Sequence, residues 1–210
     1  MGNVMIKNEE RTCRKKIIWG IIILIILAGV VIGGFIWTNS TKKYQKEESL
    51  YEDTIAQLGD SHAYALLDMN YDDNVLLTSD LVYDEGTESQ ASICCDVYYY
   101  IGNEARMLGT VMSDGTACPI TFTKDGIYGA SGHKVEKYVI SEDRTLYLQK
   151  GIYEQFDENG NVSYRSMIDG SESESTEQEY QDMFQEYSES QIVHFAYDKD
   201  EALNEYSNND

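Results

Sequence analysis

The sequence predicts an α+β chain: one N-terminal transmembrane helix, then a mainly antiparallel β domain, a meander with a few packed helices. Three observations support this class. Residues 17–37 form an uncharged, apolar run of 21 residues. Later stretches alternate apolar and polar residues, and Asp-Gly or Asn-Gly pairs punctuate them at hairpin positions. Two other stretches repeat apolar residues at helical spacing, which predicts packed helices.

The apolar run is long enough to cross a membrane. A helix of 21 residues rises about 31 Å, roughly the thickness of the bilayer's hydrocarbon core. The run is longer than the core of a signal peptide and ends in bulky residues, which favours a retained anchor over a cleaved signal. The basic residues before it are Lys7, Arg11, Arg14, Lys15 and Lys16, and those after it are Lys42, Lys43 and Lys46.

This basic excess on the N-terminal side predicts the orientation. The positive-inside bias retains residues 1–16 as a cytoplasmic basic stub and places residues 38–210 outside the cell membrane. The predicted protein is therefore a single-pass membrane protein with its N-terminus in the cytoplasm. Within the span, Gly29 and Gly33 form a GxxxG pattern, which can bring two helices close enough for a homodimer.

Charge and cysteine content restrict the partners and the location. Residues 38–210 hold 11 Lys or Arg against 35 Asp or Glu, a balance that repels nucleic acid and suits a cation or a basic protein partner. Cys94, Cys95 and Cys118 show neither a disulfide framework nor zinc-ligand spacing. One of the adjacent pair can bond to Cys118, leaving the other free. Such sparse cysteine use fits the surface of a Gram-positive bacterium.

The elements follow in order after the span. Residues 38–60 are expected to form a juxtamembrane helix or stalk, because apolar residues recur at helical spacing over 44–58 and Gly59 ends the pattern. An acidic β-rich domain is then expected over residues 61–197. Its predicted strands are 62–67, 75–77, 81–83, 91–101, 106–112, 119–123, 135–140, 145–149, 162–167 and 191–197, with turns at Asp114-Gly115, Asp125-Gly126 and Asn159-Gly160.

One helix is predicted within this domain. The low-complexity acidic stretch 170–178 is expected to be a solvated loop, at whose end Thr176 and Glu179 match a capping box. Tyr180, Met183, Phe184 and Tyr187 then follow at i, i+3, i+4 and i+7, the stripe of a helix packed on a flat surface. Residues 198–210 show no core-forming pattern and are expected to be a disordered tail.

The strongest candidate site lies between the first two strands. Asp68, Asn70 and Asp72 occupy positions one, three and five of a short loop, where oxygen side chains can converge on Ca²⁺. The glycine expected at position six is Asp73 and the glutamate expected at position twelve is Ser79. An acidic hairpin turn is the alternative interpretation.

The stretch Tyr64–Asp72, YALLDMNYD, resembles the YALxDIDGDGxPEL-type opening of poorly characterised surface proteins and lipoproteins of Gram-positive bacteria. The run Gly126–Glu136 and the stretch from Tyr153 through the predicted 176–187 helix are similar to that group as well. The resemblance covers roughly residues 62–197. It implies a cell-surface domain with a cation loop, although this chain lacks the glycines of that loop.

No catalytic motif accompanies these features. His62, His133 and His194 are scattered, with no HExxH pattern, and no phosphate-binding glycine loop is present. We therefore expect a non-catalytic interaction or accessory module at the cell surface, with no enzymatic activity and no cofactor other than the calcium of the acidic loop. A calcium-responsive module is the first alternative, and an unrecognised hydrolase with a histidine near a carboxylate is the second.

Overall fold

A computed structural model describes residues 50–59, 61–84, 90–197 and 201–206 of the chain. The described residues all belong to one compact unit, residues 47–210. This unit is mainly β, built from largely antiparallel sheets with two helices, as the sequence predicts. No helix among the described residues is long and apolar enough to span a membrane. The predicted span at 17–37 and its Gly29/Gly33 pair lie outside them.

The first sheet has five strands in the order β14-β1-β2-β5-β6. Its alternating pattern is clearest in β5, where Cys95, Val97 and Tyr99 are buried on one face, as the sequence predicts. A two-residue turn at Gly102-Asn103 connects β5 to β6, and both residues have positive φ, 60° and 71°. The strands of this sheet are β1 (Ala63–Asp68), β2 (Val75–Ser79), β5 (Cys94–Ile101), β6 (Glu104–Met112) and β14 (Leu203–Glu205); β3 (Val82–Asp84) pairs separately with β4 (Gln90–Ser92).

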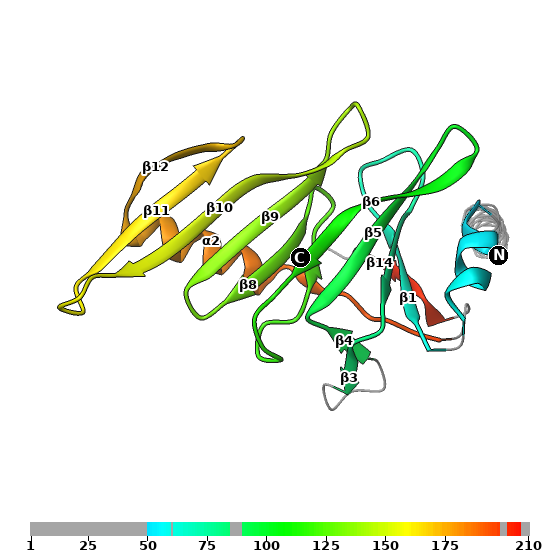
Figure 1. Ribbon diagram of the computed structural model, residues 1–210, viewed down its shortest axis with the longest axis horizontal. Helices are drawn as coiled ribbons and strands as arrows, with labels where there is room; N and C mark the ends of the chain where they lie inside the picture. The colour runs from blue at the N-terminus through cyan, green and yellow to red at the C-terminus, as the bar shows by residue number, and fades with distance from the viewer. Residues whose placement is uncertain (1–49, 60, 85–89, 198–200, 207–210) are drawn as a thin grey trace, which may run out of the picture. The chain divides into compact units, whose positions relative to one another are not determined.

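The second sheet has seven strands in the order β12-β11-β10-β9-β8-β7-β13, with all its pairs antiparallel. Helix α2 (Glu177–Glu189) follows β12 and runs behind β8 to β11 in Figure 1 before the chain pairs with β7. The strands are β7 (Thr121–Phe122), β8 (Ile127–Ser131), β9 (Lys134–Ile140), β10 (Leu146–Phe156), β11 (Val162–Ile168), β12 (Ser171–Ser175) and β13 (Gln191–Ile192).

Strand β8 separates two apolar cores. Ile127 contributes to the larger core, which joins the two sheets and includes Val97 and Phe122. Tyr128, whose side chain points to the other face, belongs to a smaller core beneath α2. The backbone of Gly129 passes so close to β6 that an added Cβ would lie 2.3 Å from the carbonyl oxygen of Met112. A glycine is therefore required where the two sheets meet.

Several sequence predictions need correction. Asp114-Gly115 does not close a hairpin, because β6 and β7 belong to different sheets and the chain passes from one to the other there. Part of the predicted loop 170–178 is strand β12, joined to β11 by a turn with positive φ at Asp169 and Gly170. The Asp125-Gly126 and Asn159-Gly160 hairpins are confirmed, since each connects a directly paired couple of strands.

Both ends of the predicted domain also differ from expectation. The helix at residues 50–58 ends before Gly59, which has φ 73°, but it does not stand apart as a stalk. The side chain of Tyr51 is fully buried against the domain, and its hydroxyl donates to the Asn74 carbonyl at 2.7 Å. Residues 203–205 are not a disordered tail: they form β14, which pairs in parallel with β1.

Candidate functional site

Helix α2 is the element that positions the candidate site. Thr176 caps its start, accepting from the Glu179 N–H while the Glu179 side chain accepts from the Thr176 N–H, so the predicted capping box is confirmed. The predicted apolar stripe is also confirmed, since Met183 and Tyr187 are buried against the seven-stranded sheet. The Tyr187 hydroxyl donates to the Pro119 carbonyl at 2.8 Å.

A polar cluster fixes the helix to the sheet beside this stripe. On Glu186, Oε1 accepts from Lys137 Nζ at 2.8 Å and from the Tyr128 hydroxyl at 2.6 Å. Burial acts to raise the pKa of Glu186, but these hydrogen bonds and the charge of Lys137 outweigh it, so the net pKa is lowered. Burial, and next the hydrogen bond to Glu186, raise the pKa of Tyr128 to about 12. At neutral pH the cluster therefore pairs an ionised carboxylate with a cation.

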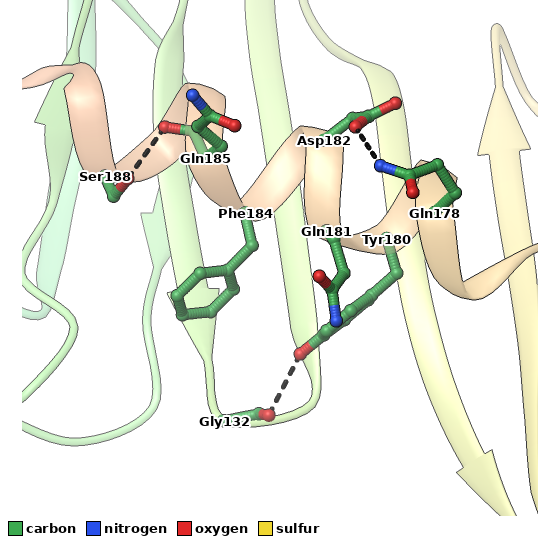
Figure 2. A pocket seen from close by; sticks show the side chains of 8 residues that line it. All are labelled: Gly132, Gln178, Tyr180, Gln181, Asp182, Phe184, Gln185 and Ser188. Atoms are coloured by element: carbon green, nitrogen blue, oxygen red, sulfur yellow. Dashed lines mark hydrogen bonds between the residues drawn. The ribbon is translucent and has the colours of Figure 1, made fainter.

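An open groove of about 560 Å³ follows the flank of α2 next to the β8–β9 turn. Figure 2 shows Tyr180 and Phe184 pointing from the helix toward Gly132, with Gln181 lying along Tyr180. The Tyr180 hydroxyl donates to the Gly132 carbonyl at 3.0 Å, which holds the ring across the groove. The remaining lining residues are polar side chains of α2: Gln178, Asp182, Gln185 and Ser188.

The aromatic side chains of this region form a continuous row. The ring centroids of Tyr164 and Tyr180 are 5.5 Å apart, and those of Tyr180 and Phe184 are 6.1 Å apart. Phe184 in turn contacts the buried Tyr187 at 5.9 Å. Tyr180 and Phe184 are themselves half-buried, so each presents part of a ring at the groove. Such aromatic contacts stabilise the row and leave ring surface for a ligand.

The same end of the sheet carries His133 next to a carboxylate. Its Nδ1 lies 2.7 Å from Glu154 Oε2, and its ring contacts Phe156 at 5.2 Å. The His133 side chain is 65% exposed, and His133 does not line the groove. His62 and His194 lie on other elements, at the start of β1 and beside β14. The hydrolase alternative predicts a histidine near a carboxylate in a deep pocket; His133 lies near Glu154, but its side chain is exposed.

The structure places the three predicted calcium ligands against other protein groups. Asp68 Oδ2 forms an ion pair with Lys124 Nζ at 2.7 Å. The amide of Asn70 donates to Asp125 Oδ1 at 2.6 Å, and Asp72 Oδ2 lies 3.2 Å from an Arg144 nitrogen. Two distant turns thus supply the partners of this loop, which pins it to the second sheet.

No cluster of three or more potential metal-ligating His, Cys, Asp or Glu side chains occurs in the described part of the chain. Basic side chains, Lys124 and Arg144, form the ion pairs with Asp68 and Asp72. The Arg144 guanidinium also lies over the Tyr99 ring, 4.8 Å from its centroid. The calcium site stays a prediction, whereas the described contacts match the alternative of an acidic turn.

The cysteines do not pair as the sequence allowed. Cys94, Cys95 and Cys118 are all free thiols, so neither of the adjacent cysteines bonds to Cys118. Burial raises the pKa of the Cys95 thiol strongly, and burial with the nearby Asp96 raises that of Cys94. These thiols are therefore protonated and weakly nucleophilic at neutral pH.

Comparison with known proteins finds no relative of this chain. No family model matches the chain, and no similar protein is found among curated proteins or solved structures. The resemblance to Gram-positive surface proteins stays a prediction.

Sequence reasoning identified α2 and its apolar stripe but missed the groove. The glutamines that lie between Tyr180 and Phe184 and on either side of them are visible in the sequence and could have indicated a polar binding surface on this helix. The contribution of Gly132 could not have been found in this way, because it depends on tertiary structure.

Proposed function

We propose that this protein is a single-pass membrane protein, with its N-terminus in the cytoplasm, that displays an acidic β-rich interaction module outside the cell. The uncharged run at residues 17–37 carries the proposal, because 21 apolar residues can cross the hydrocarbon core as a helix. The module itself is non-catalytic, and residues 1–16 form a cytoplasmic basic stub. Close packing at Gly29 and Gly33 makes a homodimer of two spans feasible.

The described domain supports an interaction role in two ways. First, it presents a groove lined by exposed ring surface and by side chains that can donate and accept hydrogen bonds, a composition common in binding sites. Second, the acidic surplus of residues 38–210 attracts basic protein partners and repels nucleic acid. The protein partner is thus a basic molecule at the cell surface, and the membrane is the anchor.

Protease accessibility on intact cells tests the topology. We expect added protease to remove epitopes in residues 38–210 and to spare an epitope tag placed before residue 16. Digestion of the tag with survival of the domain would overturn the proposed orientation. Release of the whole chain into the medium without detergent would overturn the anchor.

Cross-linking on intact cells tests the interaction role. The full chain is expected to give one discrete cross-linked product that basic competitor peptides suppress and that persists when the cross-linker is restricted to the cell exterior. Cross-linking to no partner under these conditions would argue against an interaction module.

A further inference from the structure

Helix α2 and the strand before it carry more negative charge than the sheet balances with ion pairs. Residues 169–189 contain eight acidic residues and no Lys, Arg or His. Among the ion pairs between described residues, Glu186 is the single member of this stretch to take part, with Lys137 at 2.8 Å. A surface of one charge sign raises the local concentration of oppositely charged ligands. This end of the domain therefore favours a cationic partner.

The groove adds a means of recognition to this charge. Tyr180 is held in place by its hydrogen bond to the Gly132 carbonyl and by contact with Tyr164. Its ring and that of Phe184 line the groove. Aromatic faces attract cations, and arginine does so most often in proteins. Asp182 accepts a hydrogen bond from the Gln178 amide at 2.8 Å but forms no ion pair with any described residue. A fixed ring beside carboxylates without a basic partner thus offers a guanidinium both stacking and charge attraction.

We propose that the α2 groove binds an extended, arginine-bearing segment of a protein partner, with the guanidinium stacked on Tyr180 and Phe184 and attracted by Asp182 at the rim. This inference rests on the proposed interaction role. Arginine suits the site better than lysine because its planar group can stack and donate several hydrogen bonds at once. The side-chain amide of Gln181 can accept from and donate to the main chain of the same segment. Gln185 already donates to Glu189 at 2.6 Å and offers its side-chain oxygen as an acceptor.

Two other occupants fit less well. A second copy of this domain would bring another stretch of eight acidic residues against the first, and like charges repel. A neutral glycan can stack on Tyr180 and bind the amides, but it makes no use of the acidic surplus. The dependence of binding on ligand charge therefore separates these possibilities.

The test uses the full chain, purified in a neutral detergent, and fluorescence anisotropy of labelled probes. The first probe is an octapeptide of alternating arginine and serine, and the second has citrulline, a neutral isostere, in place of arginine. We expect the arginine peptide to bind at least about tenfold more tightly, and its affinity to fall as salt is added. An oligomer of N-acetylglucosamine serves as the glycan probe.

Variants separate the groove from general attraction to an acidic protein. Gly132→Phe should block the groove without straining the backbone, because nothing lies within 4 Å of an added Cβ at this position and its φ is outside the left-handed region. We expect it to weaken arginine-peptide binding at least about tenfold. Tyr180→Leu, which removes the ring, should weaken binding about two- to fivefold. Tyr180→Phe, which keeps the ring but loses the hydrogen bond to Gly132, should weaken binding less than Tyr180→Leu.

Charge is tested with a matched pair of substitutions. Asp182→Asn should weaken binding about two- to fivefold, whereas Asp53→Asn, which removes one charge from the other helix, should leave it unchanged. Equal binding of both peptides, equal effects of the two Asp variants, or full binding by Gly132→Phe would overturn the proposal. So would Tyr180-dependent binding of the glycan without binding of the arginine peptide.

The proposed function can fail separately from this inference. If the protease experiment places the domain in the cytoplasm, the topology is wrong even where the groove binds arginine peptides. If the cell-surface cross-link survives in the Gly132→Phe protein, the interaction role stands and the groove assignment falls. Should Tyr180→Leu fail to fold, Gly132→Phe still decides the outcome.

Discussion

Truncation of Met183 tests whether α2 is packed on the sheet as described. This side chain is 1% exposed and lies in the core between the helix and the seven-stranded sheet. Replacing a fully buried methionine by alanine removes about 2–5 kcal/mol from the free energy of unfolding, through lost burial and the cavity that remains. Met107, which is 51% exposed on β6, provides the matched control. Its replacement by alanine should change stability by less than about 0.5 kcal/mol.

Urea unfolding of a fragment covering the compact unit 47–210, followed by circular dichroism, measures both effects. With a slope of about 2 kcal/mol per molar urea, a loss of about 3 kcal/mol lowers the midpoint by about 1.5 M for Met183→Ala. The Met107→Ala midpoint should stay within about 0.3 M of the wild-type value. Equal midpoints for the two variants would refute the packing of α2, and with it the position of the groove.

Three further predictions concern single side chains. Because the pKa of Glu186 is lowered in the folded state, its ionisation stabilises the fold above the unfolded pKa of about 4.3, and this contribution is lost as pH falls through the folded pKa. The Glu186→Gln protein should therefore lose less stability than wild type between about pH 5 and 3. Equal losses of stability in the two proteins would contradict the lowered pKa. Tyr51→Phe removes the buried hydrogen bond to Asn74 and should cost about 1 kcal/mol in urea unfolding, while Tyr197→Phe, at a side chain 54% exposed, should cost nearly nothing. Millimolar Ca²⁺ should leave the melting temperature unchanged, because Asp68 is already ion-paired; a rise that Asp68→Ala abolishes would restore the calcium site.

Local periodicity was sufficient to predict most of the architecture. Strand β5 alternates between buried and half-buried positions from Cys94 to Tyr100, so the face that it buries can be read from the residues alone. The same holds for α2, where the capping box and the four-residue stripe predict both its start and its buried face. These elements are amphipathic, so the spacing of their apolar residues in the sequence indicates which face is buried.

The elements that escaped prediction are those without such a pattern. All five residues of β8 are buried because it packs on both faces, so alternation is absent. Strand β12 consists of serine and glutamate, and it exists because the Asp169-Gly170 turn returns the chain alongside β11. Strand β14 has three residues and pairs in parallel with β1, far away in sequence. Tertiary contacts, rather than local preference, determine each of them.

The predicted calcium loop shows the same limit for a functional site. The spacing of Asp68, Asn70 and Asp72 is visible in sequence, but Lys124 and Arg144 reach them only when the second sheet folds. Both basic side chains lie in or next to turns of that sheet, more than 50 residues away in sequence. Regularly spaced acidic residues predict that a cation binds between them. Here the cationic partners are side chains of the same domain, Lys124 and Arg144.

The acidic stretch around α2 differs from that loop in a way that bears on function. The loop's carboxylates at Asp68 and Asp72 are matched by basic groups within the domain, whereas residues 169–189 gain one such match, between Glu186 and Lys137. Uncompensated like charges on one helix repel each other and reduce its stability. The fold tolerates this repulsion because Met183 and Tyr187 anchor the helix by burial. A bound cationic segment would reduce this repulsion between the acidic side chains. Binding of the segment should therefore increase the stability of α2, most strongly at low ionic strength.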